Sequence, residues 1–171
     1  MKLTTLACLV LFGTSTAAFA DTYGPYAGGS VGQTDYKTDG FDNPTSLELY
    51  GGVKFNQNLA AEISYNDFGE TKDQYGVGAT VSGDSVGIAG KVIIPLADNV
   101  EIYARAGIHQ WNFDAKLSGF GSGSDNGSDK FFGGGVTFKL DRQFGVGLRY
   151  TKFDVNDGDI AVTALNGEFY F

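Results

Sequence analysis

The chain has 171 residues, enough for one ordinary domain but not for a second core. Its 20 Asp and Glu residues outnumber its 12 Lys and Arg residues, and this acidic balance argues against nucleic acid as a partner. Glycine is abundant, with 26 residues, and aromatic residues make up 14% of the chain, so strands and tight turns are favoured over helices.

The first twenty residues have the pattern of a secretory signal peptide. A positive charge precedes an apolar stretch and a small-x-small cleavage site: Lys2, residues 3–12, and Ala18-Phe19-Ala20. The apolar stretch is too short to cross ~30 Å of hydrocarbon as a helix, which argues against a membrane anchor. We predict a signal peptide over residues 1–20, cleaved after Ala20, and a folded domain over residues 21–171.

The only cysteine, Cys8, lies within the predicted signal peptide. Lipoprotein cleavage before Cys8 is an alternative, but almost no apolar stretch would then precede the cleavage site. The domain of residues 21–171 has no thiol, so its stability cannot come from disulfides. A closed, hydrogen-bonded barrel would supply it.

Beyond residue 20, apolar residues recur at every second position in eight segments, as expected for strands with one apolar face. Leu47, Leu49 and Val53, for example, share one face, while Glu48 and Lys54 lie on the other. In chain order, the predicted strands are residues 26–35, 47–55, 59–66, 86–94, 101–109, 132–140, 144–150 and 160–171.

Three short turns and four longer, polar loops connect these strands. The short turns are predicted at residues 56–58, 95–99 and 141–143. Residues 118–129, with the sequence SGFGSGSDNGSD, have no apolar face and are expected to form a mobile surface loop. Residues 154–159 are expected to form another polar loop.

An even number of strands, with short turns at one end and longer loops at the other, is typical of bacterial outer-membrane barrels. Strands of ~10 residues tilted by ~40° cover an apolar band of ~25 Å. A mean hydropathy of -0.10 fits because only one face of each strand meets lipid. We therefore predict an all-β protein, an eight-stranded antiparallel transmembrane β-barrel with up-and-down meander topology.

A soluble sandwich or barrel is the alternative fold, and it would place dense charge on the outside. Here the non-apolar face carries glycine, small polar residues and spaced opposite charges, which suit the narrow lumen of an eight-stranded barrel.

Charged residues on this inward face are the candidate functional residues. An ion in a narrow lumen is costly unless it is paired, so opposite charges are expected to meet across the barrel. The pair of Glu62 with Lys91 or Arg105 is the favoured one. At similar depth we place Glu62, Lys91, Arg105 and Arg149, and nearer the short turns Lys54, Glu101, Lys139 and Glu168.

Aromatic residues near the strand ends are expected on the lipid face, at the membrane interfaces. This set comprises Tyr65, Phe68, Phe138, Tyr150, Phe169 and Phe171. Trp111 departs from the alternation of its strand, which indicates a bulge or a rim position.

Residues for catalysis or metal binding are scarce. His109 is the only histidine and has no cysteine to join it, so we interpret it as a rim residue. Residues 154–159 resemble a calcium loop, but Gly158 occupies the third ligand position and no bidentate Glu follows. We expect no catalytic residue, no cofactor and no metal site, and at most weak binding of divalent cations at this turn.

The order and spacing of several motifs over the whole of residues 21–171 resemble the OmpA-type outer-membrane barrel family. The motifs are Tyr50-Gly51-Gly52-Val53-Lys54-Phe55-Asn56, Lys91-Val92-Ile93-Ile94-Pro95, Ile102-Tyr103-Ala104-Arg105-Ala106-Gly107, Gly134-Gly135-Val136-Thr137-Phe138 and Leu148-Arg149-Tyr150. The resemblance implies that Phe171, a terminal aromatic residue, is the signal read by the outer-membrane assembly machinery. Because the sequence ends with the barrel, we expect no peptidoglycan-binding domain.

In that family, the glutamate and lysine that match Glu62 and Lys91 belong to a lumen network proposed to gate a narrow pore. This sequence departs from the pattern: Thr137 replaces an expected glutamate, and Gly147 and Arg149 occupy the positions of an arginine and a glutamate. The departure favours a network that holds the barrel together as a plug.

The functional prediction is therefore an integral outer-membrane protein of the cell envelope with a structural or surface-exposed role, without enzymatic activity. We expect a monomer in contact with outer-membrane lipid and lipopolysaccharide, with loops available for surface binding. Two alternatives stay open, a narrow, porin-like ion pore and a lipid-modifying barrel enzyme.

Overall fold

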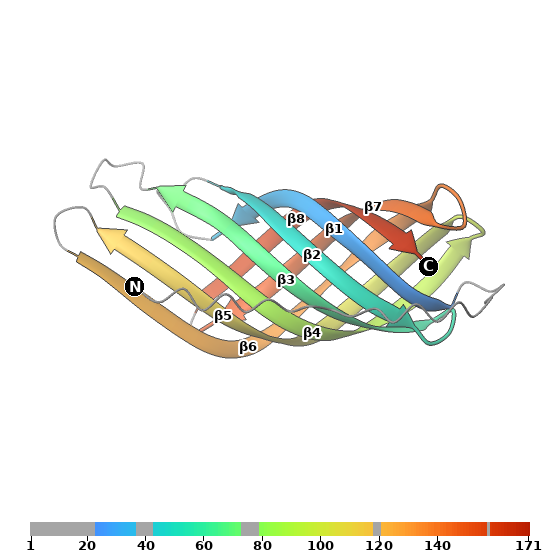
Figure 1. The fold of residues 1–171 in the computed structure, drawn as a ribbon, viewed down its shortest axis with the longest axis horizontal. Helices are drawn as coiled ribbons and strands as arrows, with labels where there is room; N and C mark the ends of the chain where they lie inside the picture. The colour runs from blue at the N-terminus through green and yellow to red at the C-terminus, as the bar shows by residue number, and fades with distance from the viewer. Residues whose placement is uncertain (1–22, 37–42, 73–78, 118–120, 157) are drawn as a thin grey trace.

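The computed structural model describes residues 23–36, 43–72, 79–117, 121–156 and 158–171, and in these residues it shows a closed antiparallel barrel (Figure 1). The predicted eight-stranded fold is confirmed. Its strands are β1 (Gly24–Asp35), β2 (Thr45–Lys54), β3 (Leu59–Lys72), β4 (Ala79–Ala97), β5 (Val100–Leu117), β6 (Gly121–Lys139), β7 (Phe144–Val155) and β8 (Gly158–Tyr170). The predicted signal peptide and its cleavage site lie outside the described residues.

Each strand pairs with the next in the sequence, and β8 pairs with β1 to close the ring. A register shift between Asp67 and Glu70 interrupts the pairing of β3 with β4. Gly69 lies at this irregularity with a φ of 78°, a left-handed conformation that a side chain would strain, and its N–H donates a 2.9 Å hydrogen bond to Asp67 Oδ1.

The two faces of the barrel wall have opposite chemistry. Along β2, Leu47 and Leu49 are 56% and 68% exposed on the outside, whereas Glu48 and Tyr50 are buried in the lumen. The same alternation of exposed and buried residues continues along β7, and it places charge inside and apolar side chains outside. This arrangement is the reverse of a soluble barrel, so that alternative is wrong. Among the described residues, no helix is long and apolar enough to cross a membrane.

Two short turns are closed by side chains that accept hydrogen bonds from the backbone. Asn56 Oδ1 accepts from the N–H groups of Asn58 and Leu59, at 2.8 and 2.9 Å. Asp141 Oδ1 likewise accepts from Gln143 and Phe144, at 2.7 and 2.8 Å. Such turns are a local preference of Asn and Asp, which is why residues 56–58 and 141–143 could be predicted.

The turn predicted at residues 95–99 is tighter than expected, because β4 continues to Ala97 and β5 begins at Val100. The short turns and the C-terminus lie at the same end of the barrel (Figure 1).

The prediction of a loop over residues 118–129 is wrong for its larger part. Strand β6 begins at Gly121 and pairs with β5 from the Leu117–Gly121 partners onward, while residues 118–120 are outside the described part. A membrane-spanning strand needs ~9–11 residues. Strands β4, β5 and β6, with 19, 18 and 19 residues, therefore project beyond the membrane on the side opposite the short turns (Figure 1).

The loop predicted at residues 154–159 is also wrong, because the β7–β8 pairing continues to the Val155–Gly158 partners. Asn156, which follows β7, takes a left-handed φ of 47°. The polar residues were interpreted as a loop because both faces of this hairpin tip lie outside the membrane, where no apolar alternation is required.

Candidate functional site

A balanced set of six buried charges fills the lumen, and we call it the charge layer. Its three carboxylates and three cations have at most 7% of each side chain exposed. They come from six different strands: Glu48 (β2), Glu62 (β3), Lys91 (β4), Arg105 (β5), Arg149 (β7) and Glu168 (β8).

Glu62 is at the centre of the charge layer and contacts all three cations. Its Oε1 accepts hydrogen bonds from Arg105 Nη1 at 2.6 Å and from Arg149 Nη1 at 3.2 Å, and Lys91 Nζ lies 3.6 Å from its Oε2. The structure thus brings together the four residues that the sequence placed at similar depth.

Two further carboxylates complete the layer. Glu48 accepts hydrogen bonds from Arg105 and Arg149, at 2.9 and 3.0 Å. Glu168 lies 3.3 Å from Lys91 and 3.7 Å from Arg149. Glu168 was predicted nearer the turns, and Glu48 was not among the predicted charged residues. The alternation of apolar and polar residues places both glutamates on the inward face. Their depth in the lumen depends on strand tilt and on the register that closes β1 against β8.

Hydroxyl groups satisfy oxygen and nitrogen atoms that the ion pairs leave open. Tyr26 donates to Glu62 at 3.0 Å and Tyr50 donates to Glu168 at 3.2 Å, while Tyr103 accepts a 2.9 Å hydrogen bond from Arg149 Nε. These three tyrosines were not predicted as part of the site. A signal was available, because the cross-strand partner of each is a glycine: Gly52, Gly28 and Gly135, respectively.

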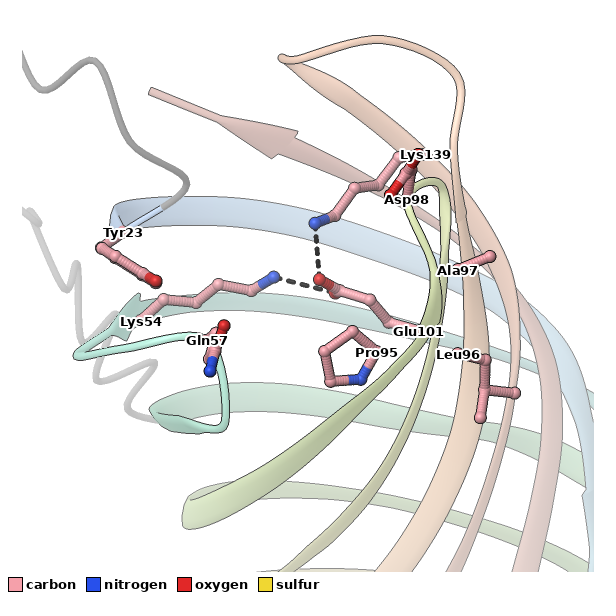
Figure 2. Close-up of a pocket in the computed structure, with 9 residues that line it drawn as sticks. All are labelled: Tyr23, Lys54, Gln57, Pro95, Leu96, Ala97, Asp98, Glu101 and Lys139. Carbon is pink, nitrogen blue, oxygen red and sulfur yellow. Dashed lines mark hydrogen bonds and ion pairs between the residues drawn. The ribbon is translucent and has the colours of Figure 1, made fainter.

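A second, smaller ion cluster lies at the end with the short turns (Figure 2). Lys54 and Lys139 both reach toward the Glu101 carboxylate, with N–O distances of 2.9 and 2.5 Å. These residues line a cavity of about 370 Å³ that Tyr23 and Pro95 also border. The structure therefore separates Lys54, Glu101 and Lys139 from the charge layer.

Rings fill the opposite half of the lumen, and we call this group the aromatic layer. It corrects three predictions: Phe68 faces the lumen rather than lipid, Trp111 keeps the alternation of β5 without a bulge, and His109 is 1% exposed rather than at a rim. The layer comprises Phe68, His109, Trp111, Phe113, Phe131 and Phe153.

The other predicted interface aromatics face outward. Tyr65, Phe138 and Tyr150 are 45–47% exposed. Phe171 is 65% exposed, and its ring lies 5.0 Å from that of Phe169, which packs in turn against Phe144.

One ion pair lies outside the membrane band, beyond Tyr150 on β7. Lys152 Nζ is 2.6 Å from Asp159 Oδ2, and this hydrogen bond raises the pKa of the Lys152 amine. Within the described residues, no group of three His, Cys, Asp or Glu side chains could hold a metal ion.

The apolar outer face, the charged lumen and the closed ring of eight antiparallel strands define an integral membrane β-barrel. Residues 4–169 match the model of the family described as outer membrane protein beta-barrel domain. The chain belongs to this family, and the predicted outer-membrane location is confirmed.

The relatives of known name agree with this assignment. The chain is 30% identical over 183 residues to outer membrane protein A of Klebsiella aerogenes, covering 96% of this chain and 51% of that protein. It is 28% identical over 173 residues to outer membrane protein A of Escherichia coli O157:H7, covering 93% and 49%. The resemblance to OmpA-type barrels is confirmed, and the chain spans about half the length of the curated relatives it matches.

Solved structures of small barrels show the same fold. The N-terminal β-barrel domain of Pseudomonas aeruginosa OprF superposes with a TM-score of 0.65 and 12% identity, over 87% of this chain and 99% of that one. Ail, the attachment invasion locus protein of Yersinia pestis, superposes with a TM-score of 0.60 and 16% identity, over 87% and 97%.

Proposed function

We propose that the chain is a structural outer-membrane barrel whose charge layer plugs the lumen, and whose strands beyond the membrane offer a surface for binding. One observation carries this proposal: Glu62 holds three cations from three strands within 3.6 Å. Removing one partner of such a buried set leaves an uncompensated charge, so the network ties the barrel wall together across its interior.

A narrow ion pore is the rival function, because the same charges could act as a gate. Single-channel recordings of refolded wild-type protein test the proposal, and we expect no conductance steps. A Glu62→Ala variant then separates the two functions. A passive plug loses stability without gaining conductance, whereas a gate that loses its carboxylate changes conductance. Conductance in the wild type would contradict the plugged barrel.

The variant must be shown to be folded before its conductance is read. The migration of heated against unheated protein on a detergent gel reports a closed barrel. Glu101→Ala is the matched control, since it removes a lumen carboxylate that pairs with Lys54 and Lys139 and lies outside the charge layer.

We also propose that the barrel catalyses no reaction. His109 supports this, because its Nε2 is 2.9 Å from the Asp154 carbonyl oxygen and its ring is enclosed by Phe131 and Phe153, away from lipid. The test is a panel of lipid hydrolase and acyltransferase assays. An activity that His109→Ala abolishes would favour a lipid-modifying enzyme.

On the outer face, Lys130 and Lys152 follow the membrane band on β6 and β7, and the Lys152 amine lies 5.9 Å from the Phe132 ring. Positive charge at this height fits the phosphates of lipopolysaccharide, which we propose as the adjoining lipid. Binding of purified lipopolysaccharide should weaken when both lysines are replaced by glutamine, and unchanged binding would contradict this contact.

Processing and assembly complete the proposal. Cleavage after Ala20 is tested by N-terminal sequencing of the membrane protein, and sequencing that begins at Met1 would contradict it. Phe171 as the assembly signal is tested by deleting it, which should reduce the amount of heat-modifiable barrel in the membrane.

A further inference from the structure

The aromatic layer spans the lumen between the charge layer and the outer side. Phe68, Phe131, Phe153, His109 and Trp111 are each at most 1% exposed. They come from β3, β5, β6 and β7, and the buried Ala89 on β4 and Ile160 on β8 join the same cluster. The layer therefore draws on strands around most of the barrel.

The rings of this layer are in mutual contact. Phe153 occupies the middle, and its ring centroid lies 5.0 Å from Phe68, 5.2 Å from His109 and 5.4 Å from Phe131. Phe113 extends the layer by stacking on Phe68 at 5.8 Å and by contacting Trp111 at 5.7 Å. These distances are those of packed aromatic pairs.

Inward-facing glycines provide the space that the rings fill. A methyl group added at Gly127 would overlap the Trp111 indole, and one added at Gly83 would overlap the Phe113 ring. Both glycines are the direct cross-strand partners of those rings. Large rings opposite glycines are one way in which side chains fill the interior of a small barrel.

The two layers present different obstacles to an ion. The charge layer offers carboxylates and cations that can replace part of an ion's hydration shell. The phenylalanine rings of the aromatic layer offer no such group. His109 Nε2 is 2.9 Å from the Asp154 carbonyl oxygen and Trp111 Nε1 donates to Asp129 Oδ2 at 2.9 Å, so His109 Nδ1 is the one ring nitrogen of this layer without a partner. An ion that enters a layer of packed rings must lose its water with little compensation.

We propose that the aromatic layer is the ion seal of this barrel on its outer side, and that it lies in series with the charge layer that plugs the lumen beneath it. The inference rests on the proposed function in one respect, the closed state of the wild-type lumen. It assigns the exclusion of ions from the outer side to residues that lie outside the charge layer.

A cysteine placed between the two layers tests the seal directly. Ser64 lies between Glu62 and Phe68 along β3, faces the lumen, and is 5% exposed. The chain's only other cysteine would be Cys8, in the predicted signal peptide. Ag⁺ binds thiolates tightly, and a silver-bound cysteine resists alkylation after unfolding.

Ser64→Cys protein is placed in sealed liposomes with the side opposite the short turns facing outward, and Ag⁺ is added outside. We expect no protection of the cysteine from alkylation with the aromatic layer intact, and full protection when Phe131→Ala and Phe153→Ala are added. Phe132→Ala is the matched control, because Phe132 is the neighbour of Phe131 but is 50% exposed on the lipid face. It should behave like the parent.

Silver access with the aromatic layer intact, or its failure after both rings are removed, would overturn the seal. Phe131→Leu with Phe153→Leu provides a second variant pair if the alanine pair does not fold on a heat-modifiability gel. Conductance of the wild type tests the proposed function separately. A conducting wild type would contradict the plugged barrel, while the silver result would still decide whether the rings exclude ions from the outer side.

Discussion

The charge layer and the aromatic layer occupy the same lumen but obtain their order from different interactions. In the charge layer, Glu62 has three cationic partners, so each of its contacts depends on sign and geometry. In the aromatic layer, Phe153 has three ring neighbours, and its contacts depend on shape alone. The layers meet where the Arg105 guanidinium lies 5.4 Å from the Phe131 ring.

This contrast separates two tasks that a single plug would combine. Ion pairs between strands resist the opening of the barrel wall, because breaking one pair leaves a buried charge without a partner. Packed phenylalanine rings exclude water and ions because they offer no oxygen or nitrogen ligand. Changes in one layer should therefore alter stability and permeability in different proportions from changes in the other.

The largest effect is expected from Glu62→Ala, which leaves buried positive charge and should lower the free energy of unfolding by roughly 3 to 5 kcal/mol. Double-mutant cycles in a urea titration should give a larger coupling energy with Arg105 than with Lys91, because the distances to Glu62 are 2.6 and 3.6 Å. Zero coupling energy with both cations would contradict the electrostatic role of the charge layer and, with it, the difference between the two layers.

The next largest effect is expected from a charge placed on the lipid face of the barrel. It tests which residues face lipid and which face the lumen, and both layers depend on that assignment. Val136 lies on the outer face of β6 and Thr137 is buried in the lumen. Val136→Arg should cost roughly 2 to 4 kcal/mol near the middle of the membrane, while Thr137→Ser should be mild. Equal costs in a folding titration would show that the inside and outside are reversed.

A smaller effect is expected from overpacking the aromatic layer. Gly127→Ala places a methyl group against Trp111 and should cost about 1 to 3 kcal/mol. Gly123→Ala is the control on the same strand, because no atom lies within 4 Å of the added methyl group. The two variants should differ in urea unfolding, and matching stabilities would mean that the rings are loosely packed.

The smallest effect is expected from Lys152→Ala. The Lys152 and Asp159 side chains are 30% and 42% exposed, and water and salt screen such a pair. Thermal and urea unfolding should be unchanged within error. A loss comparable to that of Glu62→Ala would contradict the distinction between lumen and surface pairs.

Much of the fold was determined by local sequence. Two-residue alternation identified eight strands and their faces, because a strand that separates lipid from a polar lumen must change chemistry at every residue. Asn56 and Asp141 marked turns because their side chains bond to the nearby backbone. The inward positions of Glu62, Lys91, Arg105 and Arg149 follow from the same alternation.

The alternation failed where its physical cause was absent. Residues 121–130 belong to a strand that projects beyond the membrane, where both faces can be polar, so only the pairing with β5 revealed it. Counting alternate positions along their strands places Phe68 and Trp111 on the inward face, but large aromatic residues near strand ends are typical of a membrane interface. Glycines on neighbouring strands made room for such rings inside.

Sequence alone therefore determined which side of the wall each residue faces, since that depends on its own position in a strand. Tertiary structure decided which residues share a depth in the lumen. Glu48 and Glu168 are 120 positions apart in the sequence, yet both pair with Arg149. Their meeting depends on strand tilt and on the register that closes β8 against β1, and both are properties of the whole ring rather than of any segment.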